Sequence, residues 1–407
     1  MKSPFNPRLE GLRCSACGRA HDLAAPRTVC EACGSPLLAR YDLAAVAAAT
    51  PPRMALDGGT PGPGLWRYRA VLPFAPDFPA LGLGEGGTPL LPLPRLAAAV
   101  GVRELWLKEE AGNPTQSFKA RGLALAVSGA RAFGKTAIAL PSAGNAGSAA
   151  AAYAAAAGLR CRITVPEDTP EIFVAEQRAL GAEVRLVPGT IAEAGRALGA
   201  WAPEPGWWNV ATFREPFRLE GKKTLGYELA EQSGWRLPEV IFYPTGGGTG
   251  LVGMWEAFAE LGAMGWIEGP PPRLVAVQAA GCAPVVRAFE AGERRASAWA
   301  DARTAALGLR VPSPFAGSLI LRAIRETGGT AVAVSEEELM EGMLELAESA
   351  GCFACPEGGA TLAGLRRLRL AGGVAEEDRV VIFNTGSGLK YPEAWRAALA
   401  RRAQVAR

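Results

Sequence analysis

The sequence is short of several features that mark other classes of protein. No stretch approaches the roughly 20 uncharged apolar residues that a membrane helix needs, and the first residues contain no apolar signal-peptide core. The net charge is only +3, and Lys and Arg are dispersed among Asp and Glu, so no basic patch suits nucleic acid. Eight cysteines in 407 residues do not make a disulfide scaffold. We therefore expect a cytoplasmic protein that binds neither membrane nor nucleic acid.

The remaining composition is that of a well-packed α/β protein. Hydrophobic residues make up 49% of the chain, and 407 residues exceed one ordinary core, which favours two domains and a small appendage. From about residue 85, short β-rich runs alternate with helical patterns, which is typical of parallel α/β layers. We expect strands at residues 105–108, 136–140, 161–165, 183–187, 240–243, 274–278, 330–334 and 379–383.

Four cysteines near the start form two C-x-x-C knuckles. Cys14 and Cys17 make the first, Cys30 and Cys33 the second, and twelve residues separate them. This spacing is typical of a zinc ribbon, in which four thiolates close one tetrahedral ion. A ribbon that has lost its metal, or that packs as free thiols, is the alternative. Because the protein would fill all four positions, such a zinc site would be structural rather than catalytic.

Lysine is scarce, so candidates for amine chemistry are few among the seven lysines of the chain. Lys119 stands in the segment "NPTQSFKARG", between an expected strand and an expected helix. A charged amine in the first turn of a helix opposes the helix dipole, so this position favours a neutral amine. A nucleophilic or Schiff-base lysine needs that form. A solvated surface lysine is the alternative.

Three loops follow expected strands, where open parallel sheets bind their ligands. In "SAGNAG", the amides and side chains of Ser142, Gly144 and Asn145 offer a carboxylate site, or else cap an ordinary helix. In "NTGSGLK", the hydroxyls of Thr385 and Ser387 are placed to meet a ring nitrogen.

The remaining loop is the strongest, because its consecutive unhindered amides at a helix start suit one phosphate. Its residues are Thr245, Gly246, Gly247, Gly248, Thr249 and Gly250. Neither a P-loop lysine nor a dinucleotide fingerprint accompanies it. A phosphate site, a ring-nitrogen partner and a reactive lysine together predict pyridoxal phosphate as the cofactor.

Five motifs, in order, resemble those of the pyridoxal-phosphate enzymes of the tryptophan-synthase-β fold family, and most closely the threonine synthases. They run from about Gly84 to Pro392 and are "GEGGTPLL", "NPTQSFKARG", "SAGNAG", "FRLEGKKTLGYE" and "NTGSGLK". The N-terminal ribbon also occurs in some threonine synthases.

The resemblance implies roles for particular residues. Those at the cofactor are Lys119 as the Schiff-base lysine, Phe118 beside it, Asn145 at the ring hydroxyl, residues 246–250 at the phosphate, and Thr385 at the pyridine nitrogen. Those at the substrate are Arg218, Lys222 and Ser142 at its phosphate, and the backbone amides of Ser142, Ala143, Gly144, Asn145 and Ala146 at its carboxylate.

The resemblance also implies the architecture, a fold-type II enzyme with two α/β domains of parallel or mixed sheets. We expect a ribbon at residues 1–48, a Pro- and Gly-rich linker at 49–66, a large cofactor-binding domain at 67–115 and 205–400, and a smaller domain at 116–204. A homodimer is the family's habit.

The implied activity is the conversion of O-phosphohomoserine and water to L-threonine and phosphate. The sequence departs from the family pattern at Gln116, Ala120, Thr212, Phe213 and Glu215. Glu215 would repel a dianionic substrate unless Arg214 or Lys222 neutralises it. A threonine/serine dehydratase or a cysteate-synthase-like enzyme is therefore the alternative, and a catalytically silent, ribbon-bearing binding protein is a more distant one.

Overall fold

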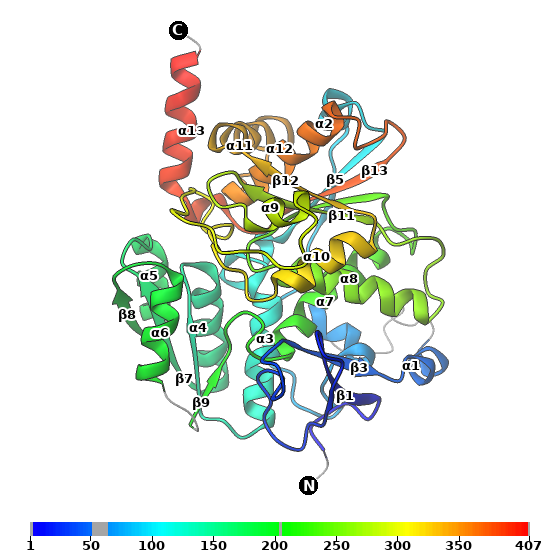
Figure 1. The fold of residues 1–407 in the computed structure, drawn as a ribbon, viewed down its shortest axis with the longest axis vertical. Coiled ribbons are helices and arrows are strands. Elements are labelled where there is room, and N and C mark those ends of the chain that lie inside the picture. The colour runs from blue at the N-terminus through cyan, green and yellow to red at the C-terminus, as the bar shows by residue number, and fades with distance from the viewer. Residues whose placement is uncertain (1–2, 51–63, 203–205, 406–407) are drawn as a thin grey trace.

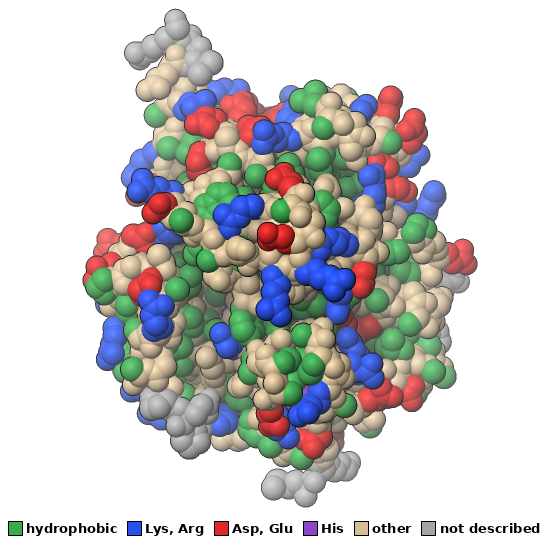
Figure 2. Space-filling model, viewed as in Figure 1, with side chains coloured by type: hydrophobic (Ala, Val, Ile, Leu, Met, Phe, Trp, Pro, Cys, Tyr) green, Lys and Arg blue, Asp and Glu red, His purple; other side chains and the backbone are tan. Residues whose placement is uncertain are grey.

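The computed structural model of the chain describes residues 3–50, 64–202 and 206–405 (Figure 1). Most of the predicted linker, residues 49–66, lies outside the described residues. None of the helices in the described ranges combines the length and the apolar character needed to cross a membrane. On the face drawn in Figure 2, acidic and basic side chains are interspersed.

The N-terminal segment is a small antiparallel sheet of strand order β2-β1-β3. Its strands are β1 (Leu9–Cys14), β2 (Ala20–His21) and β3 (Leu37–Tyr41), and helix α1 (Leu43–Ala49) follows. Asp42 begins α1 by accepting a hydrogen bond from the amide of Ala45 at 2.9 Å. This segment lies at the bottom of Figure 1, below α7.

The largest sheet has six strands in the order β12-β11-β10-β13-β5-β4. Only β4 runs antiparallel to its neighbour. The strands are β4 (Leu90–Pro92), β5 (Glu104–Glu109), β10 (Val240–Pro244), β11 (Arg273–Ala279), β12 (Thr330–Val334) and β13 (Arg379–Asn384).

Alternate residues of the central strand β10 face two different cores. Val240 and Phe242 pack with apolar residues of α12, whereas Ile241 and Tyr243 pack with residues of α7 and α8. Both faces of this strand are buried, which explains its unbroken apolar sequence.

A second sheet has four parallel strands in the order β8-β7-β6-β9. They are β6 (Ala137–Pro141), β7 (Arg160–Pro166), β8 (Glu183–Val187) and β9 (Trp207–Asn209). β9 lies beyond residue 204, where we expect the smaller domain to end, yet it pairs with β6. The chain therefore leaves this sheet later than the sequence indicates.

Helices cover both parallel sheets. They are η2 (Gly64–Val71), α2 (Pro94–Val100), η3 (Glu110–Gly112), η4 (Pro114–Gln116), α3 (Lys119–Ala132), α4 (Asn145–Ala157), α5 (Glu171–Ala179), α6 (Ile191–Trp201), α7 (Phe217–Gln232), α8 (Thr249–Ala263), α9 (Pro284–Glu290), α10 (Gly317–Glu326), α11 (Glu336–Ala350), α12 (Pro356–Leu370), η5 (Gly388–Lys390) and α13 (Pro392–Val405). In Figure 1, α13 projects from the body toward the C-terminus, and α3 runs between the two parallel sheets.

The eight expected strands are all present, and their ends differ from the expected ends by at most one residue. The capping box expected for α11 is present too, because Ser335 and Glu338 exchange side-chain to backbone hydrogen bonds. The predicted parallel α/β layers are confirmed, and they bring the three glycine-, serine- and threonine-containing loops to one place.

Candidate active site

A cavity of about 590 Å³ lies beyond the carboxyl ends of β6, β10 and β13. Nearly all residues that the sequence assigns to cofactor and substrate line it: Phe118, Lys119, Ser142, Ala143, Gly144, Asn145, Ala146, Arg218, Gly246, Gly247, Gly248, Thr249, Gly250 and Thr385. Segments far apart in the chain therefore meet in one site, as the strand-end rule for open sheets requires.

Two of the predicted site residues, Thr245 and Lys222, do not line this cavity. Thr245 is fully buried and holds the turn: its hydroxyl donates to the carbonyl of Tyr243 at 2.9 Å. Lys222 is also fully buried, with its Nζ donating to the carbonyl of Phe118 and lying 3.9 Å from the centroid of the Phe118 ring. Phe118 thus occupies the direction in which Lys222 would have to reach, and this geometry gives Lys222 no place at a substrate phosphate.

Lys119 is the first residue of α3, and its neighbours are tied to the loop after β13. The amide of Phe118 donates to the carbonyl of Thr385 at 3.0 Å, and Ser117 pairs with Gly386 as an isolated antiparallel bridge. The Lys119 Nζ lies 4.2 Å from the centroid of the Phe118 ring. Backbone contacts therefore fix where the amine enters the cavity.

The pKa of Lys119 falls to about 7, because burial disfavours its charged form and the cation of Arg218 adds repulsion. Glu357 and Cys355 oppose this shift. A neutral amine was expected here from the position at a helix start, and the direction agrees. The causes are burial and Arg218, which the sequence did not reveal.

The loop after β6 is shaped by Ser142. Its hydroxyl accepts hydrogen bonds from the amides of Gly144, at 3.2 Å, and Gly147, at 2.8 Å. Ser142 therefore closes the loop and caps α4, the ordinary structural role that the sequence left open. Asn145 and Ala146 begin α4, and first-turn amides lack intrahelical acceptors, so they are the candidate donors to a carboxylate.

The loop after β10 is a turn that only glycine can form. A Cβ at Gly246 would lie 2.1 Å from the carbonyl oxygen of Gly308, and one at Gly250 would lie 1.9 Å from the Tyr243 hydroxyl oxygen. With no side chains in the way, backbone amides at the start of α8 face the cavity. This arrangement suits a phosphate group.

Glu215 does not face the cavity as a free charge. Its carboxylate accepts hydrogen bonds from the amides of Phe217, at 2.7 Å, and Arg218, at 2.8 Å, and so caps α7. Burial raises the pKa of Glu215 to about 7. The repulsion expected between Glu215 and an anionic substrate is therefore reduced by capping, without Arg214 or Lys222.

Arg218 is buried at the start of α7 and lines the cavity. Its Nη1 donates to the carbonyl of Val210 at 2.8 Å, while its Nε has no partner among the described residues. Burial lowers the pKa of Arg218 to about 10. A buried guanidinium with an unused donor is suited to an anionic ligand.

Several other polar atoms of the cavity wall lack partners among the described residues: Asn145 Oδ1, the Tyr243 hydroxyl and Glu357 Oε2. Buried polar atoms without partners are uncommon and indicate a ligand. The site fits pyridoxal phosphate, because it combines an amine for the aldehyde, a glycine turn for the phosphate, Thr385 and an acceptor for a hydroxyl.

Sequence reasoning missed Glu357 and Tyr391 in this wall. Glu357 follows Pro356 in the first turn of α12, and Tyr391 directly follows the "NTGSGLK" motif. Proximity to a recognised motif was the available signal for Tyr391. Nothing local marks Glu357, because its partners lie far away in the chain.

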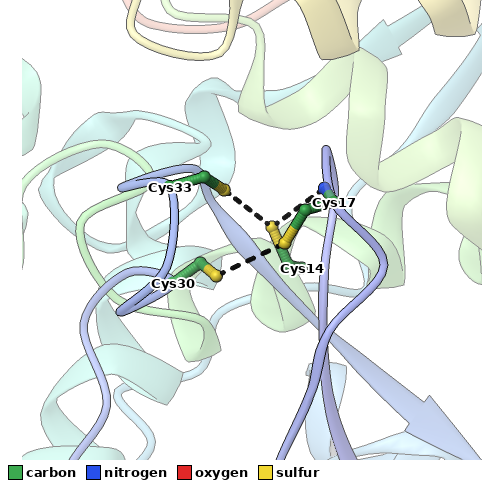
Figure 3. Close-up of side chains that lie close together, drawn as sticks. All are labelled: Cys14, Cys17, Cys30 and Cys33. Atoms are coloured by element: carbon green, nitrogen blue, oxygen red, sulfur yellow. Dashed lines mark hydrogen bonds between the residues drawn. The ribbon is translucent and has the colours of Figure 1, made fainter.

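The four ribbon cysteines converge on one point (Figure 3). The Sγ atoms of Cys14, Cys17, Cys30 and Cys33 all lie within 4.8 Å of one another. The amides of Ala16 and Cys17 donate to Cys14 Sγ at 3.4 Å. These are the features of a tetrahedral thiolate metal site. Cys352 and Cys355 are buried separately, beside Glu109 and Asn384.

Comparison with known proteins agrees with this geometry. The family model described as "Pyridoxal-phosphate dependent enzyme" matches residues 81–386. The chain is 32% identical to the threonine synthase of Methanocaldococcus jannaschii over 94% of this chain and 93% of that protein. It is 33% identical to that of Mycobacterium tuberculosis strain H37Rv over 82% of this chain and 90% of that protein.

Solved structures with similar folds include two related enzymes. Maize serine racemase aligns with a TM-score of 0.67 and 20% identity over 79% of this chain and 94% of its own. A threonine deaminase from the organism abbreviated T.th. aligns with a TM-score of 0.62 and 28% identity over 74% of this chain and 92% of its own.

Proposed function

The chain belongs to the pyridoxal-phosphate dependent enzyme family, and from that membership we propose that it acts as a threonine synthase. The reaction converts O-phosphohomoserine and water to L-threonine and phosphate. The predicted fold-type II α/β arrangement is confirmed by the solved structures that share it. Threonine synthases match over most of their length, which favours this activity over the dehydratase alternative.

One observation carries the proposal: a lysine with a pKa of about 7 shares a cavity with a glycine turn and a buried arginine. The neutral Lys119 amine is the form that can bind a cofactor aldehyde and later take a proton from a substrate carbon. When bound, pyridoxal phosphate supplies an electron sink for the charge left on that carbon. Gly246 to Gly250 would hold the cofactor phosphate, and Thr385 the ring nitrogen.

The substrate would be held at both of its ends. The amides of Asn145 and Ala146 would bind its carboxylate, and Arg218 would bind its phosphate through the free Nε. Burial excludes bulk water around Arg218, which strengthens its attraction for the phosphate. This end-to-end placement determines which carbons lie near Lys119.

The test is to incubate the purified protein separately with O-phosphohomoserine, O-phosphoserine and threonine, and to measure released phosphate and ammonia. We expect phosphate and threonine from O-phosphohomoserine. Ammonia from threonine without phosphate from O-phosphohomoserine would support the dehydratase instead. A protein whose near-visible absorbance band is absent, or survives Lys119→Ala, would favour the silent binding protein.

Three further assignments belong to the same proposal. The four ribbon cysteines hold a structural zinc ion, supported by the convergence of their sulfurs. The enzyme is placed in the cytoplasm and as a homodimer, as predicted from sequence and resemblance. The predicted domain limits are retained, except that β9 pairs within the smaller sheet.

A further inference from the structure

A chain of hydrogen bonds crosses the cavity from the smaller sheet to the larger one. Asn145 Nδ2, on α4, donates to the Tyr391 hydroxyl oxygen at 3.1 Å. The Tyr391 hydroxyl donates to Glu357 Oε1, on α12, at 3.2 Å. The amide of Gly308 donates to the same oxygen at 2.6 Å. Four segments from distant parts of the chain are thereby joined through one tyrosine hydroxyl.

The tyrosine in this chain has little freedom to move. Its side chain is buried, and its ring meets the ring of Phe173, on α5, edge to face at 5.9 Å. The preceding residue, Lys390, pairs with Glu176 on the same helix at 2.7 Å. Glu357 is buried as well. Packing therefore fixes both ends of the hydrogen bond that reaches Asn145.

The consequence falls on the orientation of the Asn145 amide. Its nitrogen is committed to Tyr391, and its Oδ1 is buried without a partner among the described residues. An amide held in this way presents an acceptor, not a donor, to a ligand.

We propose that Tyr391 and Glu357 are positioning residues that hold the Asn145 oxygen toward the cofactor. The inference rests on the proposed function, in which the ligand's donor is the ring hydroxyl of pyridoxal phosphate. Without Tyr391 the amide is free to reverse and to offer its N–H groups instead, which favours the ionised hydroxyl. The charged and titratable groups around the chain are Lys119, Arg218, Cys355 and Glu357, and Tyr391→Phe leaves all four in place.

The experiment compares Tyr391→Phe with Tyr227→Phe in the full-length protein. Tyr227 is a matched control, because its buried hydroxyl donates to Glu260 at 2.6 Å and neither residue lines the cavity. We measure binding of pyridoxal phosphate by fluorescence quenching and the pH midpoint of its near-visible absorbance band. Tyr391→Phe should weaken binding about fivefold and shift the midpoint by about 0.7 unit, while Tyr227→Phe changes neither.

A double-mutant cycle separates positioning from general damage. In an Asn145→Ala background, Tyr391→Phe should have no further effect on either quantity. Glu357→Gln should shift both in the same direction as Tyr391→Phe, and it carries the test if that variant fails to fold. Wild-type values in Tyr391→Phe, or an undiminished effect in the Asn145→Ala background, would overturn the inference alone. Absence of cofactor binding by the wild-type protein would instead overturn the proposed function as well.

Discussion

Lys119 owes its reactivity to two neighbours that a linear sequence does not display. Burial and Arg218 lower its pKa to about 7, so the amine loses its proton as the pH rises through 7. The reactive form is therefore abundant at neutral pH, where an ordinary lysine, with a pKa of about 10.4, is almost wholly charged.

This predicts how cofactor attachment depends on pH. The rate at which pyridoxal phosphate binds covalently to cofactor-free protein should rise with pH and level off above about 7, because only the neutral amine attacks the aldehyde. Stopped-flow absorbance measures that rate. In Arg218→Ala the midpoint should move upward, since a repelling cation is lost. A wild-type midpoint near pH 10 would contradict the depressed pKa.

Arg218 should also decide the preference for a phosphorylated substrate. Arg218→Ala is expected to raise the KM for O-phosphohomoserine about 10- to 100-fold, the loss of one charge-assisted hydrogen bond, and to affect unphosphorylated threonine far less. Arg310→Ala is the control, because Arg310 also lines the cavity but pairs with Asp168 through two hydrogen bonds, at 2.6 and 3.0 Å. Equal effects of Arg218→Ala on both compounds would remove phosphate recognition from Arg218.

At individual positions, the sequence predicted residues within recognisable motifs and missed those assembled by folding. Lys119 and the glycine turn carry local signals, and both line the cavity. Tyr391 and Glu357 are 34 residues apart, and Asn145 is 246 residues from Tyr391, so no spacing rule connects them. Lys222 stands one helical turn from Arg218, but the Phe118 ring closes its path to the cavity.

Among the elements, α3 is held in place by a fully buried ion cluster. Arg121 donates to Glu110 at 2.7 Å and to Glu228, on α7, at 2.9 Å. Lys108 Nζ donates to the same Glu228 oxygen at 2.6 Å, and the amide of Gly87 donates to the other at 2.8 Å. The cluster joins α3, α7, β5 and the "GEGGTPLL" loop, and it begins two residues after Lys119.

Removing the central cation should be costly, because it leaves two buried carboxylates without their strongest partner. We expect Arg121→Met to lower the free energy of unfolding by about 3–5 kcal/mol, measured by urea denaturation. Arg396→Met should change it by less than about 1 kcal/mol, because the Arg396–Glu393 pair is largely exposed. Similar losses in the two variants would show that the buried cluster adds no special stability.

A smaller effect is expected at the start of α11. Ser335→Ala removes the side-chain acceptor of the capping box and should lower the free energy of unfolding by about 1 kcal/mol. Ser349→Ala, in the last turn of the same helix, is the comparison and should be neutral or slightly stabilising. Thermal unfolding followed by circular dichroism measures both. If both variants behave alike, the box does not stabilise the helix.

Element types followed closely from the sequence wherever a strand is long and buried on both faces. The unbroken apolar run of β10 is such a case. β4 and β9 were missed, because three residues are too few to show a period and their pairing partners supply the structure.

For the molecule as a whole, the ribbon should depend on its metal. We expect about one zinc ion per chain by elemental analysis. Cys33→Ser should lower zinc content and reduce the Tm by several degrees, because metal binding stabilises the folded segment. Cys161→Ser, at a buried cysteine outside the four, should leave the zinc content unchanged. Full zinc occupancy in Cys33→Ser would rule out this site.

The ribbon is also anchored on the helix that carries Arg218. The Tyr41 hydroxyl donates to Glu220, on α7, at 2.6 Å, and the Tyr41 ring lies 4.3 Å from Lys223 Nζ. Leu38 and Val46 belong to the main hydrophobic core. A shortened chain that begins after residue 48 would therefore uncover apolar side chains and a charged pair that are now dry. Anyone trimming the protein for crystallisation or expression should keep these first residues, or redesign the surface of α7 beneath them.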